Sequence, residues 1–190
     1  MAPGADIQPA RALADAAPTG LERVTTRYSV AQDRICLAGE LPGGSPVVLW
    51  LTQRLLRRLL PPLLAWLQEQ GGAAHAVMGP ALYADALQGF AQQAARAQLQ
   101  PQAPVQVPEG SRSCLVEGVD MGRSPEMVRL VFRDAQGAVA AMVLQPQPLR
   151  QWLGIVFDAW QQAEWPLELW PDWLRESVPA RAGSAGGLVH

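Results

Sequence analysis

The chain has 190 residues, of which 49% are hydrophobic, and 15 arginines balance 17 acidic residues to give a formal net charge of −2. This length and composition are typical of a globular protein that buries a sizeable core. Nucleic-acid-binding proteins carry a basic excess, so the balanced charge argues against nucleic acid as a partner. The absence of lysine and asparagine indicates a GC-rich, bacterial source.

Two cysteines, Cys36 and Cys114, are separated by 77 residues and have no CxxC or Cys/His spacing. We therefore expect no metal site, no cofactor and no disulfide framework. Residues 1–20 are rich in alanine and proline and contain no apolar core of a secretory signal, so we expect a cytoplasmic protein. Residues 1–20 and 175–190 both have the composition of flexible tails.

The first half, residues 21–72, predicts a hairpin followed by a helix. Two strands are expected at 34–38 and 47–51 around a glycine turn at 42–46, and the alternating residues 26–30 are compatible with a further strand. From Thr52 leucines recur every three or four residues, which predicts a helix of about four turns. Pro61 and Pro62 predict a kink within it, and the pair Gly71 and Gly72 predicts its end.

The middle and the second half continue this order of elements. Residues 80–99 predict an amphipathic helix with Leu87, Phe90 and Ala94 on its apolar face and Gln88 and Gln92 on the opposite one. A proline-rich linker follows at 100–112. In residues 113–174 a short apolar stretch, 114–119, precedes predicted strands at 127–133 and 139–144 and a helix at 148–162.

The two halves align without a gap at an offset of 93 residues, and six of the 35 aligned positions are identical. The shared order of turn, strand end and helix start indicates an internal duplication, although two such units can also converge. We predict an α+β fold of two hairpin-plus-helix (ββα) units with antiparallel strands. Each helix is expected to cover the sheet of its own unit, and the whole of residues 21–174 is expected to form one domain.

Candidates for catalysis are few. The only histidines are His75, in a run of small residues, and His190, the last residue. No phosphate-binding, nucleophile-elbow or zinc-protease motif is present. An enzyme of unfamiliar design would have to use Cys114, His75 or the pair Glu117 and Asp120, held together in a pocket.

Three arginines and three tryptophans are the candidate binding residues. Arg54, Arg57 and Arg58 share one side of the leucine helix, where they form either a solvated face, a surface for an acidic partner or anionic lipid, or a phosphate contact. Five of the seven tryptophans fall within 22 residues. Of these, Trp152 and Trp160 fit the core face of a helix. The remaining three are Trp165, Trp170 and Trp173. They either fold back over the core, stay exposed as docking anchors, or form a stacking platform for a carbohydrate or a base.

These features lead to a hypothesis of a non-enzymatic protein-binding or assembly module, an adaptor or accessory subunit. It predicts that Trp170 and Trp173 are partly exposed. The alternative is peripheral attachment to anionic membranes through the three arginines and the adjoining leucines. A homodimer is also compatible with the apolar leucine and tryptophan faces.

Overall fold

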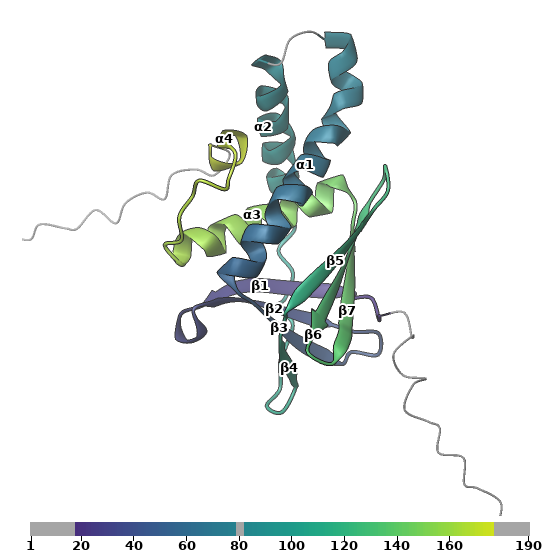
Figure 1. Ribbon diagram of the computed structural model, residues 1–190, viewed down its shortest axis with the longest axis vertical. Coiled ribbons are helices and arrows are strands. Elements are labelled where there is room, and N and C mark those ends of the chain that lie inside the picture. Colours follow the sequence, from purple (N-terminus) through teal and green to yellow (C-terminus); the bar gives the residue numbers. More distant parts are fainter. Residues whose placement is uncertain (1–17, 79–81, 177–190) are drawn as a thin grey trace, which may run out of the picture.

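The computed structural model describes residues 18–78 and 82–176, and the side chains of these residues outside 71–83. Two sheets lie on one side of the molecule and the helices on the other (Figure 1). The elements, in chain order, are β1 (Arg23–Ser29), a 3-10 turn η1 (Val30–Gln32), β2 (Arg34–Glu40), β3 (Pro46–Leu51), α1 (Gln53–Met78), α2 (Leu82–Ala97), β4 (Arg112–Leu115), β5 (Gly118–Arg123), β6 (Val128–Asp134), β7 (Gly137–Leu144), α3 (Pro146–Gln162) and α4 (Asp172–Arg175). The predicted α+β class and the order of the two ββα units are confirmed.

The first sheet has the order β1-β2-β3-β4. Its β1-β2 and β2-β3 pairs are antiparallel, as the short turns predict, and Gly43 and Gly44 take the positive φ angles of 85° and 80° that the β2-β3 turn requires. The short strand β4 pairs with β3 in parallel. It arrives from a distant part of the chain, so no hairpin fixes its direction.

The second sheet, β5-β6-β7, is antiparallel throughout. Gly137 turns the chain between β6 and β7 with φ of 128°, at the position that aligns with Gly44. A one-residue irregularity at Phe132 and Arg133 interrupts the β6-β7 register. The apolar stretch at 114–119 is divided between β4 of the first sheet and β5 of the second.

Backbone hydrogen bonds join the two sheets at two places. Before β1, Leu21 N–H donates to Ala141 of β7 at 2.7 Å, and Ala141 N–H donates to Thr19 at 2.9 Å. Before β5, Val116 N–H donates to Trp50 of β3 at 3.0 Å. The residues that lead into each unit therefore pair with the last strand of the other unit. The predicted N-terminal tail is too long, because Thr19 already belongs to the fold.

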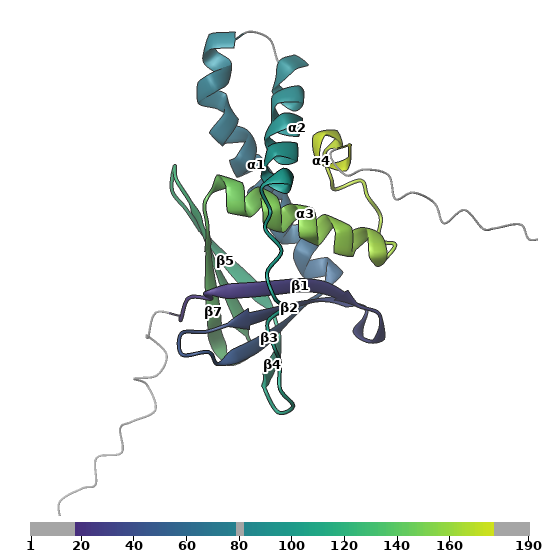
Figure 2. The same cartoon turned by 180° about the vertical axis from the view of Figure 1, so that it is seen from behind.

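Helix α1 is longer than predicted. Thr52 Oγ1 accepts a hydrogen bond from Leu55 N–H at 3.1 Å and caps its start as expected, but the helix continues past Gly71 and Gly72 to Met78. The alanines that follow the two glycines have high helix propensity, which offsets the glycine cost. Pro61 and Pro62 lie inside this single helix. α1 and α2 form a helical hairpin that projects away from the sheets (Figures 1 and 2).

The helix of each unit packs beside the first strand of the other unit, which corrects the prediction that each helix covers its own sheet. Trp152 of α3 donates its indole N–H to Thr26 of β1 at 3.1 Å. Trp66 of α1 donates to the Ser124 carbonyl, just after β5, at 3.0 Å. Residues of both halves contribute to one hydrophobic core. Because the units exchange their helices, neither sheet is covered without the other half of the chain.

The linker crosses the outer face of the first sheet (Figure 2). Val105 is buried there, and its N–H donates to Thr25 of β1 at 2.9 Å. Thr25 lies in one cross-strand row with Ala38 and Val48, both buried on this outer face. The proline-rich segment therefore acts as a strap that closes the second face of the sheet.

Candidate functional site

The three C-terminal tryptophans lie inside the molecule. Trp165 keeps 8% of its surface exposed, Trp170 2% and Trp173 4%. The prediction that Trp170 and Trp173 are partly exposed is therefore wrong, and the alternative of a segment folded back over the core is confirmed. The reason is packing after α3, where the chain turns back: Trp165 and Trp170 meet other rings edge to face, and Trp173 contacts the Arg150 guanidinium.

Trp160 of α3 lies at the centre of this aromatic cluster. Its ring centroid is 4.9 Å from that of Trp165 and 5.7 Å from that of Trp170. Its indole N–H donates to the Pro166 carbonyl at 3.0 Å. The indole N–H of Trp170, in contrast, is buried without a partner in the described part of the chain. The cluster is thus a structural core.

The predicted arginine surface is present on α1. Arg54, Arg57 and Arg58 are exposed, and none forms an ion pair with a described residue. The leucines beside them, such as Leu56 and Leu60, are fully buried. Insertion of Leu56 and Leu60 into a membrane would therefore require the folded protein to open, whereas Leu55 beside the arginines is only partly buried.

The burial pattern of α1 repeats in α3. Both helices begin at aligned positions, Gln53 and Pro146. Every buried position of α1 between residues 53 and 70 aligns with a buried position of α3. Two further positions are buried only in α3: Arg150 and Gly154 are buried, whereas their counterparts Arg57 and Pro61 are exposed. The two helices therefore share one core face and differ only in what lies on the opposite side.

Helix α2 accounts for the difference, because it covers α3 and leaves α1 uncovered there. Polar side chains of both helices make the contacts between them. The contacts are Gln92 Nε2 to the Arg150 carbonyl at 2.9 Å, Gln151 Nε2 to the Ala95 carbonyl at 2.9 Å, and the Arg96–Asp158 ion pair at 3.2 Å. The guanidinium of Arg150 donates to the Gln88 side chain and lies 5.5 Å from the Trp173 ring centroid. Burial lowers the pKa of Arg150 from its usual value.

The α2 contacts also correct the prediction of its two faces. Gln88 and Gln92 are 3% and 1% exposed, while Phe90, expected in the core, is 66% exposed. The amides are buried because Arg150 of α3 offers each of them a hydrogen-bond partner, and Gln88 also donates to the Leu67 carbonyl of α1. Gln92 Oε1 has no partner among the described residues. Hydrophobic periodicity alone could not reveal the burial of these amides, since the partner groups come from other helices.

We call the exposed counterpart of this covered surface the α1 stripe. It consists of Arg57, Arg58, Pro61, Pro62 and Ala65, all exposed. Proline has no N–H, so Pro61 and Pro62 cannot donate to the carbonyls of Arg57 and Arg58, four residues earlier. The stripe therefore combines two guanidinium groups with two backbone carbonyls that lack their helical donors.

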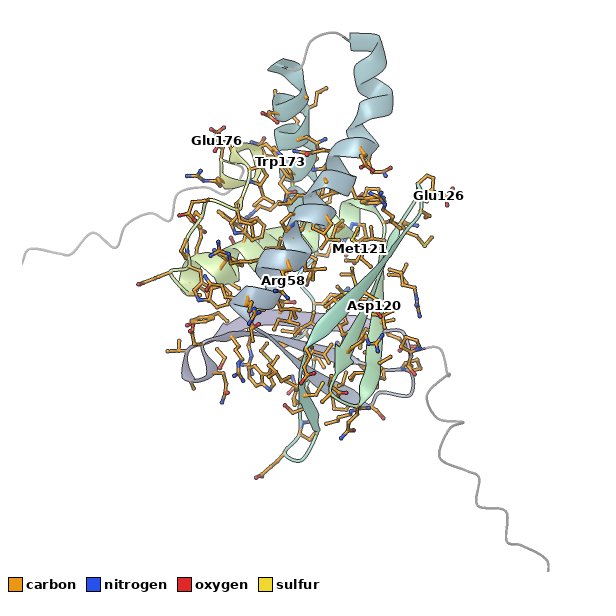
Figure 3. The ribbon with its side chains drawn as sticks, in the orientation of Figure 1. Arg58, Asp120, Met121, Glu126, Trp173 and Glu176 are labelled. Carbon is orange, nitrogen blue, oxygen red and sulfur yellow. The ribbon has the colours of Figure 1, made fainter. Side chains whose placement is uncertain are left out.

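A hollow of about 260 Å³ borders the α1 stripe, where Arg58 and Pro62 face Met121 of β5. Figure 3 shows Arg58 on α1, with Asp120 and Met121 on the neighbouring strand. The corresponding hollow between α3 and β1 has about 610 Å³, and residues 98–104, which follow α2, form one of its walls. The α1 side lacks such a wall in the described structure.

A second surface feature lies beside α4. Asp85, Asp172 and Glu176 line a hollow of about 430 Å³ together with the exposed Phe90. Trp173 forms part of its floor, and Figure 3 shows Trp173 and Glu176 near α2. No sequence pattern indicates this acidic hollow, because its residues come from segments almost 90 positions apart.

The candidate catalytic residues are only partly brought together. Cys114 and Glu117 line a hollow of about 320 Å³, but burial and then the nearby Asp134 raise the pKa of the Cys114 thiol, which disfavours the reactive thiolate. Asp120 is paired with Arg133 at 3.0 Å. The side chain of His75 and the whole of His190 lie outside the described residues. Within the described ranges no three His, Cys, Asp or Glu residues are grouped for a metal ion.

Comparison of the chain with protein-family models, curated proteins and solved structures finds no match. Among residues 18–78 and 82–176, no helix combines the length and apolar character that crossing a membrane requires.

Proposed function

We propose that the protein is a non-enzymatic binding or assembly module that docks an acidic protein partner on the exposed arginine surface of α1. The observation that carries this proposal is the contrast between two aligned helices. On α3 the surface opposite the core is covered by α2, whereas on α1 the same surface is open and carries Arg57 and Arg58.

Charge supports an acidic partner. The two stripe arginines and the neighbouring Arg54 have no carboxylate partner among the described residues, although this chain pairs many of its other arginines. Exposed arginine readily forms bidentate hydrogen bonds with carboxylates, and it is enriched at protein interfaces. Such a surface attracts an acidic partner electrostatically, and added salt weakens the binding.

The proposal is tested by photo-crosslinking in the native cells. A benzophenone amino acid is placed at Ala65, on the stripe, or at Ala135, an exposed turn residue away from it. We expect Ala65 to capture one protein with an acidic surface that Ala135 does not capture.

Charge reversal then identifies the contact. Capture is expected to disappear in the double variant Arg57→Glu/Arg58→Glu. It is expected to persist in Arg27→Glu/Arg129→Glu, which changes the net charge equally at exposed strand positions that form no ion pair with the described side chains of α1. Equal loss in both folded variants, or capture that neither variant affects, would contradict the proposed surface.

A further inference from the structure

We infer that the element docked on the α1 stripe is an α-helix of the partner, packed on α1 as α2 packs on α3. This inference rests on the proposed function and specifies the partner that the surface accepts. It is carried by the alignment of two helices that share their core face and differ only at the positions that α2 covers.

The stripe has the shape of a helix-binding surface. On α3, the residues that contact α2 are spaced as a stripe along one side of the helix, from Arg150 through Gly154 to Asp158. At Gly154 the approach is close, since an added Cβ would lie 3.3 Å from Gln92 Nε2. The counterparts on α1, Pro61 and Ala65, are also short side chains, which let a second helix approach.

The α2–α3 contact defines the polar groups that the docked helix needs. Gln88 accepts hydrogen bonds from the Arg150 guanidinium, and Gln92, one turn later, donates to the Arg150 carbonyl. Arg57 is the aligned arginine, and its carbonyl lacks the helical donor because residue 61 is proline. A partner helix with an acceptor and, four residues later, an amide would satisfy both groups of Arg57.

The charge of the stripe favours a carboxylate as that acceptor. Arg150 is surrounded by its own chain and binds a neutral glutamine, whereas Arg57 is exposed and has Arg54 and Arg58 within one turn. A glutamate at the position of Gln88 forms a charge-assisted pair with Arg57.

Arg58 aligns with Gln151, which donates to the Ala95 carbonyl near the end of α2. An arginine there adds a favourable interaction with the helix C-terminus.

The chain's own α2 provides the probe. A fluorescent peptide of residues 82–98, with Gln88→Glu and a covalent staple on its outer face to hold it helical, is titrated with the full-length protein. We expect saturable binding that Arg57→Glu weakens about tenfold or more, as for the central arginine of an interface. Arg129→Glu, a matched reversal elsewhere, is expected to leave binding unchanged.

Thiol crosslinking reports the register of the docked helix. Ala65 aligns with Asp158, whose carboxylate pairs with the Arg96 guanidinium of α2, so a short bifunctional thiol crosslinker is expected to join a cysteine at Ala65 to the peptide carrying Arg96→Cys. A cysteine at Ala135 is expected not to be joined to it. Mass-spectrometric mapping separates these products from any adduct of Cys36 or Cys114. Thiol crosslinking at Ala135 and Ala65 alike would overturn the register and with it the inference.

A second peptide separates this inference from the proposed function. Ala91→Pro in the unstapled peptide keeps its charge but breaks the helix. If both peptides bind equally through Arg57, the acidic-partner proposal stands and the helical docking is wrong. If neither binds, the helix inference is wrong, and the photo-crosslinking experiment alone decides the function. A dimer in light scattering that Arg57→Glu/Arg58→Glu dissociates would show a second copy as the occupant and also overturn the inference.

Discussion

At the scale of single residues, two buried tryptophans of the same cluster differ in whether their indole N–H has a hydrogen-bond acceptor. Trp160 and Trp170 are almost equally buried, 1% and 2% exposed, and their rings are in contact. Only Trp160 has a hydrogen-bond acceptor for its indole N–H, the Pro166 carbonyl. The motif of repeated TrpPro pairs therefore builds a folded-back segment, in which proline supplies both the turn and an acceptor.

This difference predicts that a Trp→Phe substitution lowers the free energy of unfolding more at position 160 than at position 170. Trp160→Phe removes ring volume and a hydrogen bond, whereas Trp170→Phe removes similar volume and an indole N–H that has no partner in the described chain. The free energy of unfolding is expected to fall by about 1 kcal/mol more for Trp160→Phe. Urea denaturation followed by circular dichroism measures both values. Equal losses would show that the two indoles are equally satisfied in solution.

The two cysteines predict a dependence of stability on pH. Burial is the main cause that raises the pKa of both thiols, Cys36 and Cys114, above their unfolded values near 8.5. Above that pH the unfolded chain releases protons that the folded chain retains, so the free energy of unfolding falls as pH rises. The hydrogen bond to Asp33 raises the pKa of Tyr28 as well, which adds a loss at higher pH.

The double variant Cys36→Ala/Cys114→Ala is expected to reduce the fall in the free energy of unfolding between about pH 8.5 and 10. Tyr28→Phe is expected to reduce that fall only above this range. Denaturation curves at several pH values measure the effect. Alkylation by iodoacetamide gives a second measurement, in which the half-buried Cys114 is modified before the buried Cys36. An unchanged pH slope in the double variant would contradict the assignment to the thiols.

At the scale of elements, local pattern predicts where a helix begins but not what covers it. The Thr52 cap, the glycine turns and the leucine period are determined by neighbouring residues, and the structure places these features as the sequence indicates. The burial of Gln88 depends on Arg150 of α3, which lies 62 residues away, and Phe90 on the opposite side of α2 is exposed. The arginine surface was therefore predictable as a pattern, whereas its openness required the packed structure.

The aligned positions Gly154 and Pro61 give a matched prediction. Gly154→Leu places a side chain against Gln92 and is expected to lower the free energy of unfolding by about 1–3 kcal/mol through overpacking. Pro61→Leu lies on the uncovered stripe and is expected to leave stability unchanged or raise it, because leucine restores a helical N–H. Urea denaturation compares the two. A similar loss at Pro61 would show that the stripe is already covered within the chain.

At the scale of the whole molecule, the two units are interlocked. α3 lies on β1, α1 lies beside β5, and the segments that lead into β1 and β5 each pair with the last strand of the opposite unit. The duplication predicted from the sequence describes the order of elements along the chain. It does not indicate which sheet each helix covers. The apolar face of each helix can cover either its own sheet or the sheet of the other unit. The sequence pattern is the same in both cases, so only tertiary contacts distinguish the two arrangements.

The interlocked arrangement predicts that the halves fold only together. Fragments 1–108 and 109–190 each retain a complete ββα order, yet each lacks the partner of its helix and of its leading segment. Each sheet then exposes a hydrophobic face that no internal element covers. We expect neither fragment alone to show a cooperative urea transition, and an equimolar mixture to recover the near-ultraviolet signal of the tryptophan cluster. A cooperative transition in fragment 1–108 alone would show instead that the first unit covers its own sheet in solution.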